Sequence, residues 1–297
     1  MERIFKTGSS SIVLGSFYFN NFVDTKTRDN KLLKITKINY NHNELKYLSY
    51  IRKIEDYDKY YVIPDEELYY IKPTNFFYEY IKKMADEESR NIFIGTINCY
   101  FINYAGDQDI YETIYWLSKN NFTVWKSYKK IYKFCHKIAL GLSYLHQKKI
   151  CHLDIKPENI IYNSNTQDFR IIDFGFSSIE PFDDFVINIR GTPGYMPKYF
   201  PNEKITKYLP KVEANDFLFE EEKMPILVDR KLIYKIDSFC LGRVIFCIKN
   251  FYKDLKVYNC RNNERKRENK LDMIISSLIN NDIVKRKTIQ ECLDLYF

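Results

Sequence analysis

The sequence predicts an α+β chain in which a small, strand-rich amino-terminal part precedes a larger, mainly helical part. Three observations carry this prediction. Lys31 to Lys37 alternates in polarity as a half-buried strand does. Lys126 to His146 carries apolar residues at intervals of three and four, the spacing of an amphipathic helix. Two apolar pairs, Ile160-Ile161 and Ile171-Ile172, indicate short strands that hold polar residues at their ends.

Composition bounds the kind of protein. The chain has 297 residues, enough for a sizeable core, and 46 Lys and Arg against 39 Asp and Glu give a net charge of +7. This mild excess is typical of a solvated surface, so a nucleic-acid partner is not expected. Seven cysteines without a C-x-x-C pair, and no signal-peptide pattern, indicate reduced thiols in a cytoplasmic or nuclear protein.

No apolar run approaches the roughly 18 residues that span a bilayer, so a soluble chain without membrane association is expected. The richness in Tyr, Asn, Ile and Lys is typical of AT-biased coding, as in some large DNA viruses and protists. In a viral setting the compartment would be the host cytoplasm.

The most informative stretch is C-H-L-D-I-K-P-E-N-I-I, Cys151 to Ile161, followed after a polar gap by I-I-D-F-G, Ile171 to Gly175. Phosphoryl transfer needs an acceptor that orients a hydroxyl nucleophile, a cation for the γ-phosphate, and hard oxygen ligands for Mg²⁺. The stretch supplies these groups in the order Asp154, Lys156, Asn159 and Asp173.

These residues resemble the catalytic loop and magnesium motif of the eukaryotic-type serine/threonine protein kinases, with H-L-D in place of H-R-D. The resemblance implies one two-lobed kinase domain over residues 1–297, with a β-rich lobe at 1–105, a mainly helical lobe at 106–297, and inserts near 52–97 and 199–230. It further implies ATP and Mg²⁺ as cofactors, a protein substrate with Ser or Thr acceptors, and a monomer.

The same resemblance assigns roles within the motif. Asp154 would orient the substrate hydroxyl, Lys156 would neutralise charge on the moving phosphoryl group, and Asn159 and Asp173 would hold the metal. His152 and Phe174 would pack with Leu48 rather than bind a ligand. Thr192 would bridge Asp154 and Lys156.

Lys6 to Gly15, K-T-G-S-S-S-I-V-L-G, matches a glycine-rich phosphate loop if Val13 is the valine that follows it. Gly8 then takes the middle glycine position, while Lys6 and Ser11 replace the outer two glycines. An ordinary β-turn is the alternative.

Lys34 is the candidate phosphate-anchoring lysine, and Glu44, near the start of a predicted helix, is its expected ion-pair partner. The alternatives are that both are solvated charges, or that Lys37 takes the lysine's place. Leu32 stands where the family has a small residue against adenine.

Asn98 to Asp107 is a predicted buried strand that runs into a small-residue turn and resembles the interlobe hinge. The backbone of Asn103 and Ala105 would face adenine, with Ile102 as gatekeeper and Ile161 beneath the base. Asp107 or Asp109 would accept hydrogen bonds from the ribose. A plain strand and turn remains open.

Four further expectations follow from the motifs. Leu153 cannot bind a phosphorylated loop residue as the family arginine does, so activity should depend little on loop phosphorylation. Lys198 stands where the family has a glutamate that pairs with an arginine, matched here by Arg286, so either Glu203 replaces it or the bridge is lost. Asp237 should brace the catalytic loop. His136 and His146 are expected as surface or core residues rather than ligands.

The remaining segments carry weaker signals. E-E-L-Y-Y-I-K-P predicts a strand, and the rest of 52–97 is expected to be peripheral. The basic run Arg261 to Lys270 is expected to be a solvated loop.

Two rival functions stay open: a non-catalytic kinase-like binding module, suggested by the missing glycines, Leu32 and Lys198, and a kinase of a small molecule. Retention of the four polar motif residues argues against the first. The D-I-K-P-E-N and G-T-P-G-Y-M tracts, which serve polypeptide docking in the family, argue against the second.

Overall fold

The computed structural model describes residues 4–7, 11–14, 31–36, 42–64, 69–71, 97–115, 124–125, 127–180, 186–187, 192, 194–197, 226–227, 232–254 and 262–297. The chain divides into two compact units. The first comprises residues 1–52 and 62–105, and the second comprises 53–61 and 106–297.

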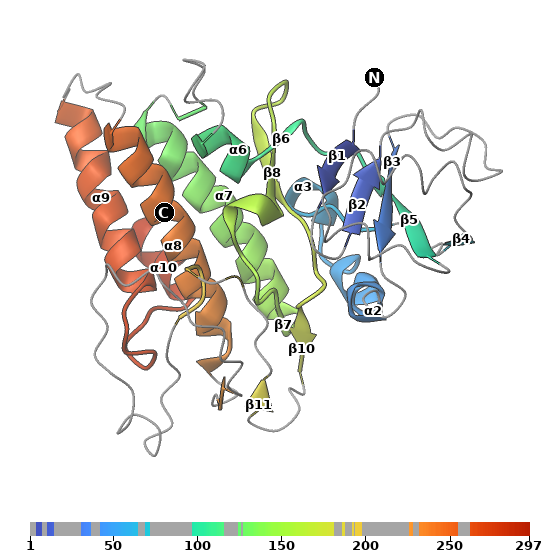
Figure 1. The fold of residues 1–297 in the computed structure, drawn as a ribbon. Helices are drawn as coiled ribbons and strands as arrows, with labels where there is room; N and C mark the ends of the chain where they lie inside the picture. The colour runs from blue at the N-terminus through green and yellow to red at the C-terminus, as the bar shows by residue number, and fades with distance from the viewer. Residues whose placement is uncertain are drawn as a thin grey trace. The chain divides into compact units, whose positions relative to one another are not determined.

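The first unit is built on a five-stranded antiparallel sheet with the order β1-β2-β3-β5-β4 (Figure 1). Its strands are β1 Ile4–Thr7, β2 Ser11–Leu14, β3 Lys31–Thr36, β4 Tyr69–Ile71 and β5 Ile97–Asn103. The predicted strands at 31–37, at E-E-L-Y-Y-I-K-P and before the hinge are thereby confirmed.

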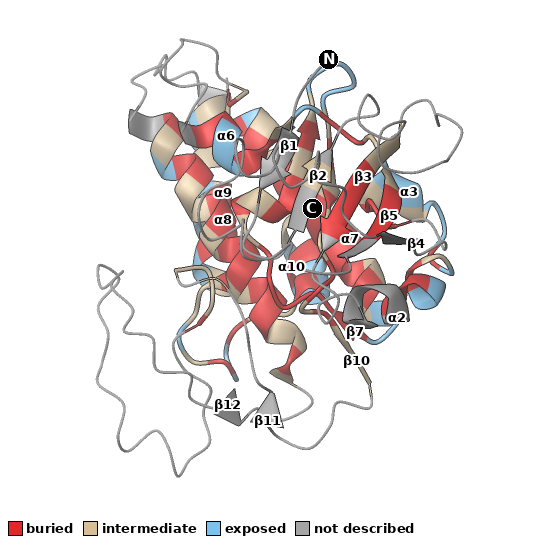
Figure 2. Ribbon diagram, turned by 45° about the vertical axis from the view of Figure 1, so that its right-hand side comes forward, coloured by how far each residue is buried: buried red, intermediate tan, exposed pale blue. Residues whose placement is uncertain are grey.

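β3 and β5 form the core of this sheet. They pair along their whole length, from Lys31↔Asn103 to Thr36↔Asn98. Leu33, Ile35, Cys99 and Phe101 are almost completely buried, and both strands are largely red in Figure 2. The helix α2, His42–Ile51, supplies buried apolar side chains of its own through Leu48 and Ile51.

The second unit is mainly helical. Its helices are α3 Tyr57–Tyr60, α6 Ile110–Tyr115, α7 Tyr128–Gln147, η4 Pro157–Asn159, α8 Tyr234–Asp254, α9 Asn262–Leu278 and α10 Ile289–Tyr296. α7, α8, α9 and α10 contact one another, and α7 and α8 turn many buried residues inward (Figure 2). No helix among the described residues is both long and apolar enough to cross a membrane.

α7 begins where two side chains satisfy its first free amides. Ser127 Oγ accepts a hydrogen bond from Lys130 N at 3.3 Å, and Glu264 Oε2, from α9, accepts from Tyr128 N at 2.8 Å. Such caps stabilise a helix end by about 1 kcal/mol. Most of the apolar stripe predicted for this helix is buried, as Ile131, Cys135, Ile138 and Leu142 show, whereas Tyr132 is only partly buried.

Short strands position the loops of the second unit. β8 Ile160–Asn163 and β9 Asp168–Ile171 form a hairpin that β6 Gln108–Asp109 joins, which confirms the two predicted apolar strands. β7 Ile150–Cys151 pairs with β10 Ser178–Ile179, and β11 Val186–Ile187 pairs with β12 Ile226–Leu227.

The expectation that residues 52–97 are peripheral is wrong for their first part. Tyr61 is 2% exposed, forms a bridge with Ile171, and donates a hydrogen bond to Gly141 O at 2.5 Å. Its ring meets that of Phe174 edge to face at 5.9 Å. The consecutive aromatic and branched residues after position 59 give this segment enough apolar surface to enter the core. Residues 72–96 lie outside the described part.

The basic run is not a loop, because Asn262 to Lys270 forms the first half of α9. The stretch lacks glycine and proline, and its charges pair at helical spacing, as in the contact of Arg267 with Glu264 at 2.8 Å. The helix propensity of its Lys, Arg and Glu residues, rather than its charge, determines its structure.

Candidate active site

The catalytic-loop motif forms a closed cluster of polar contacts around Asp154. This carboxylate is 3% exposed and accepts hydrogen bonds from Asn159 Nδ2 at 2.9 Å and from Thr192 Oγ1 at 3.0 Å. Lys156 Nζ lies 3.1 Å from Asp154 Oδ2 and donates to Thr192 Oγ1 at 2.6 Å. The predicted bridging of Asp154 and Lys156 by Thr192 is present in this geometry.

Strand pairing brings the two candidate metal ligands to the same place. Ile160 lies opposite Ile171 in the β8–β9 hairpin, and Ile172 N donates to Asn159 O at 2.9 Å, so Asp173 follows immediately after the residue paired with Asn159. Asn159 Nδ2 donates to Asp154 O at 2.8 Å as well as to its carboxylate, which orients the amide and leaves Oδ1 for a cation.

Asp173 has a left-handed backbone, with φ 65°, and its Oδ1 accepts from Gly175 N at 3.3 Å. A residue with a Cβ adopts this conformation at a cost, and such strain is concentrated at functional sites. The donor set of one carboxylate and one amide oxygen suits Mg²⁺, which prefers hard oxygen ligands.

Asp237 braces the catalytic loop from α8, as predicted. It is fully buried, and its Oδ2 accepts from His152 N at 2.9 Å while its Oδ1 accepts from Leu153 N at 2.8 Å. Leu153 has φ 65°, a strained value for a leucine, so the carboxylate holds the loop in a backbone conformation that it would not adopt on its own.

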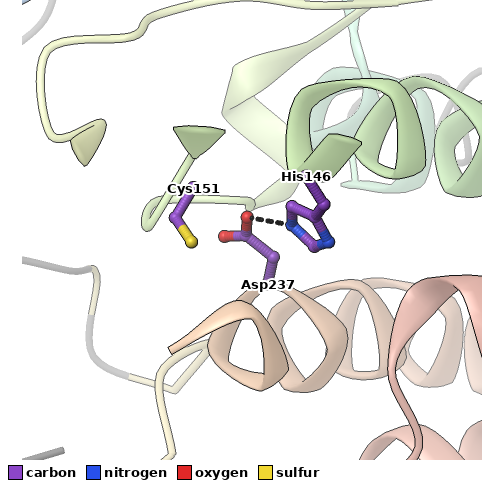
Figure 3. Close-up of side chains that lie close together, drawn as sticks. All are labelled: His146, Cys151 and Asp237. Carbon is purple, nitrogen blue, oxygen red and sulfur yellow. Dashed lines mark hydrogen bonds and ion pairs between the residues drawn. The ribbon is translucent and has the colours of Figure 1, made fainter. Parts of the chain in front are cut away.

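His146, from the last turn of α7, completes the brace (Figure 3). Its Nε2 lies 2.9 Å from Asp237 Oδ2. Burial alone would raise the pKa of Asp237. The hydrogen bond with His146, the electrostatic effect of the nearby His146 and His152, and the hydrogen bond from His152 N together outweigh burial and lower this pKa. His146 was expected as a surface or core residue, and it is a partly buried residue that binds a carboxylate.

Cys151 lies beside this pair, so that His146, Cys151 and Asp237 bring three possible metal-ligand atoms within 4.8 Å of one another (Figure 3). Their state does not suit a metal. Burial raises the pKa of the Cys151 thiol well above its usual range, while a metal needs the thiolate. Both oxygens of Asp237 already accept hydrogen bonds. His146 and Asp237 therefore form a hydrogen-bonded brace, and Cys151 is a buried thiol beside it.

The loop is also tied to the metal motif by packing. His152 and Phe174 rings lie 5.1 Å apart, and His152 Nε2 lies 3.1 Å from Ile172 O. The predicted packing of His152 with Phe174 is confirmed, and their contact with Leu48 stays a prediction. Tyr61, whose ring also packs against Phe174, was not predicted, because the two positions are far apart in the chain.

In the first unit, Lys34 lies on β3 and is 8% exposed. It pairs with Val13 on one side and Tyr100 on the other, and its Nζ lies 5.7 Å from the centre of the Tyr100 ring. Such a cation–π contact offsets part of the cost of burying an ammonium group. Gly8, Lys37 and the Glu44 side chain lie outside the described residues, so the phosphate loop, the rival lysine and the ion pair stay predictions.

The hinge candidates lie at the end of β5. Leu32 pairs with Ile102 across β3 and β5, while Asn103 is exposed and Ala105 is buried. Asp107 has another role: its carboxylate accepts from Ser164 N and Ser164 Oγ, both at 2.9 Å, and so caps the β8–β9 turn. The ribose and adenine contacts, including that of Ile161, stay predictions.

Gly106 marks the place where the chain passes closest to β8. A Cβ added there would lie 2.3 Å from Tyr162 O, so only glycine fits. Asp109 is 7% exposed and caps α6 through reciprocal hydrogen bonds with Glu112, at 2.8 Å and 3.1 Å. Both features fix the path of the chain between the strand and the helix.

Comparisons with known proteins agree with this geometry. The family model for the protein kinase domain matches residues 96–214. A calcium/calmodulin-dependent serine/threonine-protein kinase of Malus domestica is 30% identical over 162 residues, which are 53% of this chain and 36% of that protein. The probable serine/threonine-protein kinase fhkB of Dictyostelium discoideum is 37% identical over 140 residues, 42% of this chain and 12% of that protein.

Over parts of its length, the chain is similar to the eukaryotic-type serine/threonine protein kinases. Its fold is the two-lobed protein kinase fold, because the structure of the kinase PK-1 of Cydia pomonella granulovirus superposes with a TM-score of 0.59 over 99% of this chain and 93% of that one, at 16% identity. The chain spans about a third or less of the length of the relatives named above.

Proposed function

We propose that this chain transfers the γ-phosphoryl group of ATP to serine or threonine hydroxyls of a protein substrate. The observation that carries the proposal is the cluster in which Asp154, Lys156, Asn159 and Thr192 contact one another. A structural turn would not need a buried carboxylate with this many charged and polar donors.

The roles of these residues follow from their contacts. Asp154 is held by its donors so that it orients an acceptor hydroxyl and takes up its proton. Lys156, which is partly exposed, stabilises negative charge on the moving phosphoryl group. Asn159 and Asp173 would hold Mg²⁺, which would supply positive charge to offset that of the phosphates. These steps depend on positioning and electrostatic stabilisation rather than on covalent catalysis.

Most of the residues proposed to hold the nucleotide belong to the first unit, whereas Ile161 and Asp107 belong to the second. Lys34 anchors the phosphates, Gly8 and Val13 cover them, and Glu44 tethers Lys34. The backbone of Asn103 and Ala105 recognises the adenine edge, Ile161 lies beneath it, and Asp107 accepts from the ribose in addition to its contact with Ser164. The buried Lys34 and its place on β3 support this assignment.

The D-I-K-P-E-N tract supports serine and threonine as acceptors, because the family members specific for tyrosine lack a lysine at the place of Lys156. Six described cysteines are free and five of them are buried, which fits a monomer with reduced thiols acting in the cytoplasm or nucleus, or in the host cytoplasm if the chain is viral. Gel filtration and localisation of a tagged chain test these two points.

An assay with radiolabelled ATP and Mg²⁺ on one basic and one acidic generic protein tests the proposal, with Asp154→Asn as the matched control. We expect phosphoserine or phosphothreonine from the wild type and a loss of at least about 100-fold in the variant. Equal transfer by both forms would indicate a contaminating kinase. ATP binding without transfer would favour a binding module, and transfer only to small hydroxyl compounds would favour a small-molecule kinase.

A further inference from the structure

The segment Gly194–Pro197, which follows Thr192, docks on one face of α8 through contacts that no motif predicted. Arg243 Nε donates to Gly194 O at 3.0 Å, and Cys240 Sγ lies 3.6 Å from Met196 Sδ. Cys247 forms a side-chain hydrogen bond with Tyr195. Residues 240, 243 and 247 are three and four apart, so they share one face of the helix.

This anchor is linked to the catalytic cluster by a single turn of backbone. Gly194 has φ 89°, a left-handed conformation that favours glycine, and Tyr195 N donates to Thr192 O at 3.2 Å. Thr192 in turn contacts Asp154 and Lys156. A contact that fixes the Gly194 carbonyl therefore also fixes the position of Thr192.

Arg286, the residue that would hold this segment in the family, is engaged elsewhere. It is 1% exposed, and it donates from Nε to Asn280 O at 2.9 Å and from Nη1 to Lys235 O at 3.0 Å. Its guanidinium lies 4.8 Å from the ring centre of Phe239. No ion pair between Arg286 and a carboxylate is found within the described part of the chain, and burial lowers its pKa to about 10. Lys198 and Glu203 lie outside that part.

We propose that Arg243 is a positioning residue that holds the substrate-docking segment, Gly194–Pro197, on α8. In this chain it would perform the anchoring function that the ion pair of the residue matched by Arg286 performs in the family. The inference rests on the proposed function for its catalytic consequence, but the anchor itself is a property of the fold. Arg243 acts through the Gly194 carbonyl and Thr192.

Two substitutions separate the hydrogen bond from the bulk of the side chain. In Arg243→Gln, the amide nitrogen is as many bonds from Cα as Arg Nε, so it keeps a donor for Gly194 O. In Arg243→Met, a methyl group takes that place and the donor is lost. Arg286→Met and Arg286→Lys are the comparison variants, and a thermal melt verifies that each variant is folded.

Amide hydrogen exchange of the peptides that cover residues 192–197 measures the anchor without any need for activity. We expect about 10-fold faster exchange in Arg243→Met, because a hydrogen bond to a charged donor is lost, and exchange within about 3-fold of wild type in Arg243→Gln. The KM for a peptide substrate should rise about 10-fold in Arg243→Met, while the KM for ATP stays unchanged.

Both Arg286 variants should have a lower melting temperature than the wild type, and the decrease should be smaller for Arg286→Lys. Amide hydrogen exchange at residues 192–197 and the KM for the peptide should stay near the wild-type values. Unchanged exchange in Arg243→Met, or equally fast exchange in Arg286→Lys, would overturn the proposal. If the wild type transfers no phosphate while Arg243→Met still exchanges faster, the anchor stands and only the proposed function fails.

Discussion

Replacing Asp237 with asparagine tests the brace beneath the catalytic loop. The wild-type carboxylate is fully buried and accepts from His152 N, Leu153 N and His146 Nε2, at 2.8–2.9 Å. Asparagine has nearly the same shape, but one of its two terminal atoms is a donor. That –NH₂ group would face N–H donors, so at least one buried backbone amide would lose its acceptor.

The cost can be worked from these contacts. An unsatisfied buried amide costs about 1–3 kcal/mol, and loss of a charge-assisted hydrogen bond adds about 1.5 kcal/mol or more. We therefore expect Asp237→Asn to lower the free energy of unfolding by about 3 kcal/mol and the melting temperature by about 6–12 °C. Urea unfolding followed by circular dichroism measures the difference. His146→Gln, which keeps a donor near Asp237 Oδ2, should cost about 1 kcal/mol.

The pH dependence gives an independent reading of the same group. The folded-state pKa of Asp237 is lowered, so its contribution is present above the unfolded pKa of about 3.9 and is lost as the pH falls through the folded value. The difference in the free energy of unfolding between wild type and Asp237→Asn should thus be constant above about pH 5 and disappear in acid. If Asp237→Asn lowered the free energy of unfolding at pH 7 by less than about 1 kcal/mol, the proposed role of Asp237 as a brace would be refuted.

Three further predictions concern other parts of the second unit. Phosphatase treatment should leave transfer activity unchanged, because Leu153 offers no guanidinium to a phosphate, and a loss of activity would contradict this. Gly106→Ala should destabilise by about 2 kcal/mol or more in thermal unfolding, since its Cβ would meet Tyr162 O at 2.3 Å, and a neutral effect would contradict the close approach. Burial raises the pKa of Tyr61, so its contribution to the free energy of unfolding is present below the unfolded pKa of about 10 and is lost as the pH rises further. In Tyr61→Phe, the free energy of unfolding should therefore fall less steeply above pH 10 than in the wild type. The same slope in both proteins would contradict this prediction.

Most of the catalytic cluster could be predicted from the sequence because Asp154, Lys156 and Asn159 are close together in the chain, while Thr192, 38 residues from Asp154, was placed by its motif. Asp154, Lys156 and Asn159 lie on one loop. The short β8–β9 hairpin that follows this loop brings Asp173 back to it. Local spacing therefore determines their proximity, and their residue types determine the chemistry.

The contacts that support the cluster could not be predicted in the same way. Tyr61 reaches Gly141 across 80 residues, and Arg243 reaches Gly194 across 49. Each donor meets a backbone carbonyl, which every residue has, so no residue type at the accepting end marks the contact. The first half of α9 was missed because its polar residues conceal the apolar face that begins at Leu271.

A crystal structure with Mg²⁺ and a non-hydrolysable ATP analogue tests the central claim most directly, namely that residues distant in sequence converge on one triphosphate. We predict Mg²⁺ with Asn159 Oδ1 and Asp173 as ligands at about 2.1 Å. Lys34 Nζ should lie about 3 Å from a phosphate oxygen. A nucleotide bound elsewhere, or one whose phosphates meet Asp173 while Lys34 points to another surface, would contradict it.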